Sequence, residues 1–325
     1  MKVTIHQLRR TFLPQIAVIV VLALFPLIGV PRAWLLYLFI FYIYLAMVNM
    51  WNLLAGYSGL ICLCPAAFVG LAGYTMTVMT WLGLPYYVGI MPGGIVAALF
   101  AVLVSVPVFR MKGIYFAIGT LVVPEILRFV FLLWKPVGGA MDGKGRGYTV
   151  HGVAGVSQSE TYWFALAIGV VSIFLMRYIL RSKFGRGLSA IHNNDSTAAS
   201  SGINVFNLKL FSFVIAAFVI GIAGTIFYIY QGFIEPVSAF SVQWLITVVL
   251  ATVIGGEGTE EGPIVGTIIV VFMYFLLARY AEISLIIQGS ILIGIMLLAP
   301  EGIMGYVRKT KIYRSLLQLS VNYQV

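Results

Sequence analysis

RSKFGRGLSAIHNNDSTAASSGIN, residues 181–204, is the longest interruption between strongly apolar segments in the second half of this chain. Phe184, Leu188 and Ile191 recur within it at the spacing of one helix face, which predicts a short helix with one apolar side. Because an apolar segment long enough to cross a membrane stands on either side, the stretch is predicted to be a structured loop between two membrane spans.

A second short helix is predicted at residues 196–201. Asn194 or Asp195 can cap its N-terminus, and Gly202 occupies the position after its end where a left-handed residue is favoured. A helical, half-apolar loop with several cations is suited to docking a soluble partner. The alternative is a solvated connection that its cations hold near the membrane surface. These cations are Arg181, Lys183 and Arg186.

Composition assigns the chain to a class. It is 61% hydrophobic and only 9% charged, whereas soluble domains are roughly 25% charged, and its mean hydropathy is +1.03. We predict an all-α polytopic membrane protein with a single transmembrane domain over residues 1–325. The net charge of +10 does not indicate a nucleic-acid partner, because the cations gather at the ends of apolar segments. Cys62 and Cys64 match neither a disulfide framework nor a metal site, and we interpret them as small buried residues.

About ten transmembrane helices are predicted, several near the roughly 20 residues that cross a bilayer. Basic residues precede the first apolar run, but no small-x-small cleavage site follows it, so that run is predicted to be a retained span. The runs are 12–30, 35–55, 60–81, 88–109, 114–134, 162–180, 208–231, 242–255, 264–279 and 283–299.

Positive charge sets the predicted orientation, since cytoplasmic loops carry an excess of Lys and Arg. With residues 1–11 inside, the loop 181–206 and the tail 300–325 are also cytoplasmic, and the loop 135–161 is external. The cytoplasmic side then holds most of the 20 basic residues, namely Lys2, Arg9, Arg10, Arg110, Lys112, Arg177, Arg181, Lys183, Arg186, Lys209, Arg308, Lys309, Lys311 and Arg314.

Residues 49–74, NMWNLLAGYSGLICLCPAAFVGLAGY, combine glycines and a proline with an apolar span. Irregular backbone at membrane depth persists only where protein or water covers it, so we predict a broken helix beside a translocation pathway. Tight helix packing is the alternative explanation for Gly70 and Gly73. The candidate pathway residues of this stretch are Asn49, Asn52, Gly56, Tyr57, Ser58, Gly59 and Tyr74.

Glu125 and Arg128 are ionisable residues inside a predicted span, one helical turn apart and next to Pro124. Ionisable groups in a span are costly and mark functional sites by default, so we add both to the candidate pathway. The alternative is a buried structural ion pair that locks two helices. A fixed pair is a poorer proton relay than an isolated carboxyl group.

The turn GGEGTEEGPIVG, residues 255–266, is glycine-rich and acidic. It can cradle a cation or meet a basic partner surface, or it is a solvated turn. It lacks the Lys-Ser or Lys-Thr of a phosphate loop, and the sequence holds no Walker A pattern, HExxH, GxSxG or nucleophile–base set. We therefore predict that the chain is not an enzyme, binds no metal and draws energy from a gradient or from another subunit.

Several blocks of the sequence resemble the LivM-type membrane permease of branched-chain amino-acid ABC importers. They stand in the family's order and cover the chain from about residue 50 to 305. The blocks are NLLAGYSG (52–59), AAFVGLAGY (66–74), GIYFAIGTLVVPEILR (113–128), SKFGRGLSAIHNND (182–195), SGIN (201–204), GPIVGT (262–267) and APEGIMG (299–305).

The resemblance implies ten helices in two inverted-topology halves, set in a prokaryotic inner membrane. It also implies a paralogous second permease, two ATPase subunits that carry the ATP and Mg, and an external binding protein. The 181–204 loop becomes the segment that docks on an ATPase. Its predicted coupling residues are Phe184, Gly185, Arg186, Leu188, Ile191, Ala198, Ala199 and Gly202.

Departures from the family pattern, such as Cys64-Pro65 and the acidic 255–262 turn, leave the solute open between branched-chain or related amino acids and a small polar solute such as an amide or urea. The rival hypothesis is a stand-alone secondary transporter with ion coupling at Glu125. A non-transporting scaffold explains the composition but neither the glycine-broken helix nor Glu125.

Overall fold

The computed structural model describes residues 19–28, 31–111, 113–134, 147–277, 281–298 and 301–309. The predicted cytoplasmic N-terminus 1–11, the first part of the predicted external loop (135–146) and most of the predicted C-terminal tail (310–325) lie outside the described residues.

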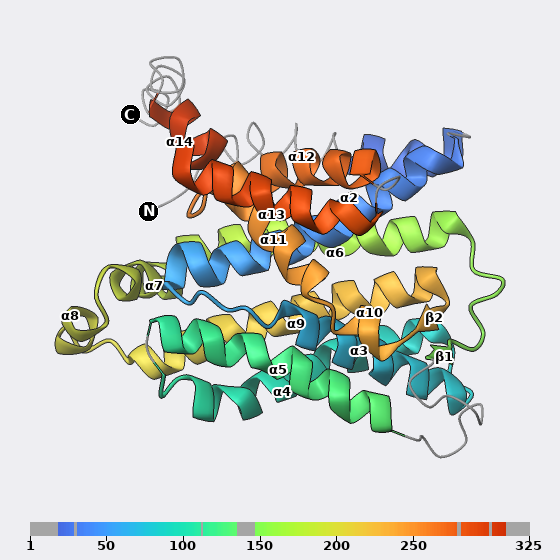
Figure 1. Cartoon of the computed structure of the whole chain (residues 1–325), viewed down its shortest axis with the longest axis horizontal. Helices are drawn as coiled ribbons and strands as arrows, with labels where there is room; N and C mark the ends of the chain where they lie inside the picture. The colour runs from blue at the N-terminus through green and yellow to red at the C-terminus, as the bar shows by residue number, and fades with distance from the viewer. Residues whose placement is uncertain are drawn as a thin grey trace, which may run out of the picture.

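The described chain is a bundle of helices with one two-stranded ladder (Figure 1). The elements are η1 (Phe25–Ile28), α2 (Arg32–Asn52), η2 (Leu53–Tyr57), α3 (Pro65–Trp81), η3 (Tyr86–Gly89), α4 (Ile90–Val108), α5 (Ile114–Leu133), β1 (Tyr148–Thr149), α6 (Gln158–Arg181), α7 (Lys183–Asn193), α8 (Asp195–Ser200), α9 (Val205–Gln231), β2 (Phe233–Ile234), α10 (Pro236–Ala239), α11 (Val242–Gly255), α12 (Gly262–Leu277), α13 (Ala281–Leu298) and α14 (Gly302–Lys309).

Seven helical segments in the described part of the chain are long and apolar enough to cross a membrane. The all-α polytopic class is thus confirmed, whereas the count of about ten is not. Part of the difference has a physical cause: the chain is not helical just before α3, which leaves that helix 17 residues, and α12 has 16. The arrangement in two inverted halves stays a prediction. The seven segments are Arg32–Tyr57, Tyr86–Val108, Ile114–Leu133, Gln158–Arg181, Val205–Gln231, Pro236–Gly255 and Ile286–Arg308.

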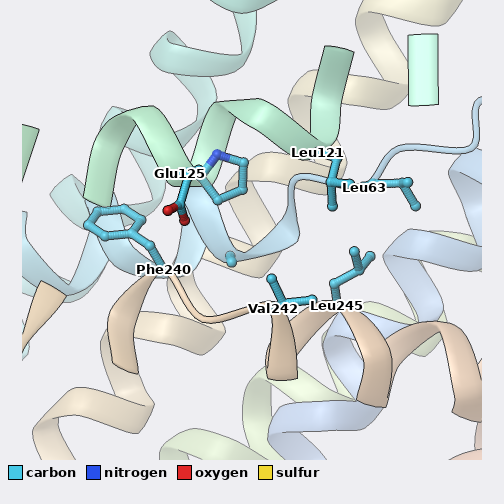
Figure 2. Close-up of a pocket in the computed structure, with 8 residues that line it drawn as sticks. Leu63, Leu121, Glu125, Phe240, Val242 and Leu245 are labelled. Carbon is cyan, nitrogen blue, oxygen red and sulfur yellow. The ribbon is translucent and has the colours of Figure 1, made fainter. Parts of the chain in front are cut away.

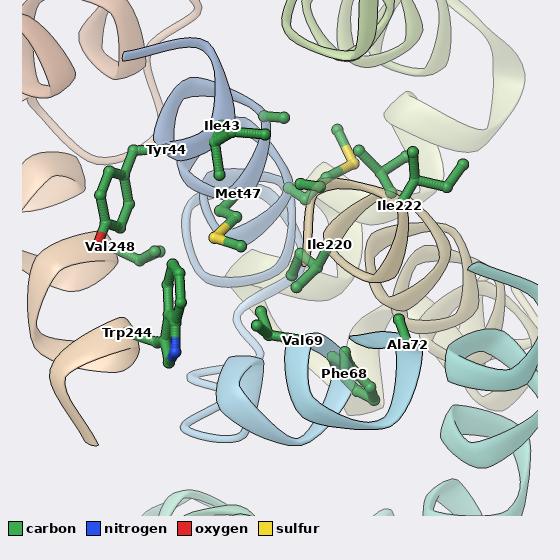
Figure 3. Packing of buried hydrophobic residues seen from close by; sticks show 14 of the residues in the cluster. Ile43, Tyr44, Met47, Phe68, Val69, Ala72, Ile220, Ile222, Trp244 and Val248 are labelled. Atoms are coloured by element: carbon green, nitrogen blue, oxygen red, sulfur yellow. The ribbon is translucent and has the colours of Figure 1, made fainter. Parts of the chain in front are cut away.

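The core lies where α2, α3, α9 and α11 meet, and Figure 3 shows their apolar side chains interleaved. Small residues bring the surrounding helices close together. A Cβ atom on Gly93 of α4 would lie 2.3 Å from the hydroxyl of Thr225 on α9. A Cβ atom on Gly70 would lie 2.3 Å from the ring of Phe240, and one on Gly73 would lie 2.4 Å from the ring of Tyr228. Tight packing is therefore the correct explanation for Gly70 and Gly73.

The two ends of the bundle differ in structure (Figure 1). The short helices α7 and α8 project from one end. At the opposite end β1 pairs antiparallel with β2, with Tyr148 opposite Ile234. Trp81 packs edge-on against Tyr148 there, with ring centroids 5.2 Å apart. The chain thus carries an isolated helical projection at one end and a packed aromatic cap at the other.

Candidate functional site

The helix predicted to be broken is broken. α2 passes into the π-helical turn η2, and the chain then runs without helical structure from Gly59 to Cys64 before Pro65 starts α3. Gly59 has a φ of +68°, a conformation that glycine adopts without strain. Side chains supply partners for the exposed backbone, as a spanning protein requires. The Trp51 indole donates to the Cys62 carbonyl (2.7 Å), and the Leu63 amide donates to the Thr120 hydroxyl (2.9 Å).

The two asparagines predicted to line the pathway are buried by their own chain. Asn49 of α2 donates to the hydroxyl of Ser172 on α6 at 3.0 Å. Asn52 donates to the Thr259 carbonyl and accepts from the Gly258 amide, both at 2.8 Å. Asn49 is 1% and Asn52 0% exposed. Neither side chain faces an open passage in this structure, because each amide group is buried and hydrogen-bonded to a helix or turn that is distant in the sequence.

The remaining candidates from the same stretch are likewise held inside or at the end of the bundle. Ser58 is buried and donates to the Leu54 carbonyl at 2.6 Å. Tyr74 is buried with its ring 4.2 Å from that of Phe131. Among the described residues its hydroxyl finds no hydrogen-bond partner. Gly59 is exposed, and Tyr57 is half-buried.

Gly56 owes its place to a close approach of two backbones. A Cβ atom there would lie 2.4 Å from the Gly258 amide nitrogen and 2.6 Å from the Asn52 side-chain oxygen. Since one of those neighbours is backbone, no side-chain rotation relieves the overlap. Gly56 therefore packs η2 against the 256–261 turn, a role that its prediction as a pathway residue did not include.

A small pocket lies between α5, the irregular segment before α3, and the junction of α10 with α11 (Figure 2). It is partly open, and its empty volume of about 250 Å³ includes space that is continuous with solvent. Its walls are apolar apart from one carboxylate, that of Glu125, which points toward the loop that carries Phe240 and Val242. The lining residues are Leu63, Ala66, Leu121, Pro124, Glu125, Phe240, Val242 and Leu245.

Glu125 and Arg128 pair with each other, as their spacing predicted. The Arg128 Nε donates to the Glu125 Oε2 at 3.0 Å, and a second contact joins Nη2 to Oε1. The pair is not buried in the chain, which corrects the interpretation of the two residues as a lock between helices. The Glu125 side chain is 46% and the Arg128 side chain 27% exposed. Both residues lie on a helix of which only Phe116, Thr120 and Pro124 are buried.

The two short helices of the 181–204 stretch form as predicted, with small shifts at their ends. The Ser182 hydroxyl caps α7 by accepting from the Phe184 amide at 3.1 Å. Asn194 rather than Asp195 caps α8, accepting from the Ser196 amide at 2.9 Å, so α8 begins one residue earlier than predicted.

α8 ends as its sequence predicts. Gly202 has a φ of +81°. The Gly202 amide donates to the Ala199 carbonyl and the Ile203 amide to the Ala198 carbonyl, both close to 3 Å, which is the Schellman arrangement. Local chemistry therefore fixes both ends of the second helix.

The predicted coupling residues divide between two faces. Gly185, Leu188, Ile191 and Ala198 are buried in this chain, with Leu188 packed against Leu53 and Ile179. These four hold the segment onto the bundle, so direct contact with a partner is not open to them in this structure. The exposed coupling residues are Phe184, Arg186, Ala199 and Gly202.

The acidic 256–261 turn meets basic residues of its own chain, an outcome that the sequence did not predict. Arg177 of α6 lies 3.5 Å from Glu260, and Arg308 of α14 lies 2.5 Å from Glu261. Desolvation raises the pKa of the Glu257 carboxyl, and the nearby His192 of α7 partly opposes that shift. The described residues include no group of three or more His, Cys, Asp and Glu side chains that could hold a metal.

Comparisons with known proteins place the chain in a family. The family model "Branched-chain amino acid transport system / permease component" matches residues 34–299. The chain is 28% identical over 283 residues to the high-affinity branched-chain amino acid transport system permease protein LivM of Salmonella typhimurium, and equally to that of Escherichia coli K12. In both cases the alignment covers 79% of this chain and 66% of the relative, a little less than two thirds.

A probable branched-chain amino acid transport permease protein LivH of Methanocaldococcus jannaschii is 28% identical over 167 residues, which cover 49% of this chain and 51% of that protein. No solved structure matches the chain. The family model nevertheless spans most of the sequence, including the pocket and the α7–α8 projection. The chain therefore belongs to the family of permease components of branched-chain amino acid transport systems.

Proposed function

We propose that this chain is the translocating subunit of an ATP-driven importer for branched-chain or related amino acids in a prokaryotic inner membrane. In this proposal both chain termini and the α7–α8 projection are cytoplasmic, and the β1–β2 end faces outward. The chain itself hydrolyses nothing. ATP and Mg are held by two separate ATPase subunits, a second permease completes the membrane domain, and an external binding protein delivers the solute.

The observation that carries the proposal is the construction of the α7–α8 projection. Its inner face is fixed to the bundle by buried Leu188 and Ile191, while Phe184 is 47% exposed. The exposed Phe184 ring stacks on Phe211 of α9 with centroids 4.6 Å apart. Phe184 and Phe211, which is 36% exposed, thus form one apolar patch next to the helix that carries exposed Arg186, and such patches mark interaction sites. A rigid, basic, partly apolar surface on a permease-family chain is suited to transmit force from a soluble ATPase.

Contact with the ATPase is tested by crosslinking in the assembled complex. A photoreactive amino acid at position 184 is expected to give an adduct with an ATPase subunit. The same label at Tyr87, 55% exposed near the β1–β2 end, serves as the matched control and is expected to give none. An ATPase adduct from Tyr87 but not from position 184 would reverse the proposed orientation, and no adduct from either would contradict the docking.

The second candidate is a stand-alone secondary transporter. The observation in its favour is that Glu125 borders a pocket on an uncovered helix face. Uptake of leucine by the purified chain alone, driven by an ion gradient, decides for this candidate. Uptake that requires both ATP and the partner subunits decides for the importer.

A further inference from the structure

The exposed face of α5 carries the Glu125–Arg128 ion pair, and Glu125 also lines the pocket. Most of the exposed side chains on this helix are large and apolar, among them Ile126 and Phe129, each 56% exposed. Apolar side chains can face either lipid or a partner protein, but a carboxylate and a guanidinium are costly in hydrocarbon. Protein or water must therefore cover this face where Glu125 and Arg128 lie.

The pocket beside the pair has the features of a site for a small molecule with charged and apolar parts. Phe240, Val242 and Leu245 supply an apolar wall, and Glu125 reaches in from α5 (Figure 2). Ala66 belongs to the first turn of α3, so the positive end of that helix dipole also lies at the pocket. Fixed polar groups and an apolar wall around one small space are typical of ligand sites.

We propose that Glu125 and Arg128 bind the charged head of a zwitterionic amino acid in transit, which rests on the proposed function. Without solute, each charge is satisfied by the other. When an amino acid enters the pocket, Glu125 accepts hydrogen bonds from its ammonium group, Arg128 donates to its carboxylate, and the apolar side chain lies against Phe240 and Leu245. No net charge is left at membrane depth in either state.

The geometry of the pair fits this exchange. Residues at i and i+3 on a helix have Cβ atoms about 5–6 Å apart, so a group placed between the two side chains can contact both. An ammonium and a carboxylate on one carbon atom present complementary charges at such a spacing. Because the pair is already satisfied, binding replaces one set of contacts with another. The site is therefore weak, as release to the inside requires.

The test uses the complete complex in proteoliposomes, with leucine as the solute. Two double variants are compared with the wild type: Glu125→Gln with Arg128→Gln removes both charges, and Glu125→Arg with Arg128→Glu keeps an ion pair but reverses it. An ion pair with a purely structural role survives reversal. Reversal at the asymmetric pocket instead places like charges opposite the solute head. The matched control is the reversed pair Arg177→Glu with Glu260→Arg, an ion pair that lies outside both the pocket and the α7–α8 projection.

We expect both α5 variants to assemble and to hydrolyse ATP at the basal rate, with leucine uptake lowered at least about tenfold, since charge-assisted hydrogen bonds to the solute are lost. The control pair is expected to keep wild-type uptake. Wild-type uptake in either α5 variant overturns the inference and leaves the proposed function intact. A wild-type complex without ATP-driven uptake contradicts the proposed function instead.

A second measurement decides the matter if the double variants fail to assemble. Leu121→Cys places a thiol in the pocket wall at a residue that is 41% exposed, whereas Cys62 and Cys64 are buried and provide a low background. Leucine, delivered by the binding protein, is expected to slow modification of that thiol by a small polar reagent. A modification rate that leucine does not change in any nucleotide state overturns the inference.

Discussion

α2 and α5 are both spanning helices with polar residues at membrane depth, but the two helices differ in how deeply they are buried and in where their polar residues find partners. About two thirds (67%) of the most apolar part of the α2–η2 segment is buried inside the bundle, whereas only 17% of the most apolar part of α5 is buried. Asn49 and Asn52 of α2 find partners on other elements. Glu125 and Arg128 of α5 pair with each other, Arg128 also lies over the Phe129 ring of the same helix, and both remain partly exposed.

The difference separates polar groups that hold the fold from polar groups that can meet a solute. A buried amide group that is hydrogen-bonded to another part of the chain is shielded from a passing molecule. A mutually satisfied pair on an open face can exchange partners at little cost. The pathway is accordingly expected along the open face of α5 and the irregular 59–64 segment, with the polar end of α2 serving as its support.

The largest expected effect is at Gly56, where η2 meets the 256–261 turn. Gly56→Val should prevent assembly of the complex, because its side chain would overlap the Gly258 backbone. Even Gly56→Ala should lower the yield of assembled complex. The matched control is Gly289→Ala in α13, where an added Cβ meets nothing within 4 Å. Size-exclusion chromatography of the purified complexes measures this. Normal assembly of the Gly56→Val variant would mean that the two backbones are not in contact.

Asn52→Leu should have the next largest effect. It leaves the Gly258 amide and the Thr259 carbonyl without their side-chain partner, and each unsatisfied buried group costs about 1–3 kcal/mol. We expect a clear fall in the melting temperature of the complex. Asn207→Leu, on an exposed position of α9, is the control and should change little. If both variants melt together with the wild type, the amide of Asn52 is not holding the turn.

Arg186→Glu should affect coupling and leave folding intact, because the side chain is exposed on α7. We expect leucine uptake to fall severalfold per ATP hydrolysed, since reversal of the charge weakens a basic docking surface. Arg186→Lys keeps the charge and should retain most of the coupling. Equal ratios of uptake to hydrolysis in the Glu and Lys variants would show that charge at position 186 plays no part in docking.

The smallest expected effects concern α8. Asn194→Ala removes the cap of a six-residue helix and should cost about 1 kcal/mol of local stability. Asp195→Asn breaks only the partly exposed ion pair with Lys209, and such pairs near a surface are worth about 0–1 kcal/mol. Hydrogen exchange at the α8 amides should therefore accelerate more for the first variant than for the second. The reverse order would contradict the assignment of the cap to Asn194.

Local features of the fold could be predicted from the sequence because their causes are local. Gly59 and Pro65 marked the break after α2, and Asn194 and Gly202 marked the ends of α8. Contacts between distant residues could not be predicted. The hydrogen bond between Asn52 and the Gly258 amide joins residues 206 positions apart, and neither residue carries a local sign of it.

The sequence also could not predict that most of α5 is exposed, and the reason is physical. In a bilayer, lipid and protein core are equally apolar, so hydropathy does not tell which helix faces are covered. The sequence therefore gave no reason to prefer the polar residues of α5 over those of α2 as pathway residues. Only the packing of the helices separates those with partners inside the chain from those on its surface.

The most direct test of the account is photocrosslinking from the open face of α5 in the complex within its membrane. A benzoylphenylalanine replaces Phe129, and the control label replaces Leu103, which is 70% exposed on α4. We predict that the label at position 129 forms an adduct with the second permease, and that the label at position 103 reacts with lipid alone. Lipid adducts alone from position 129 would contradict the account, because the Glu125–Arg128 pair would then face the bilayer.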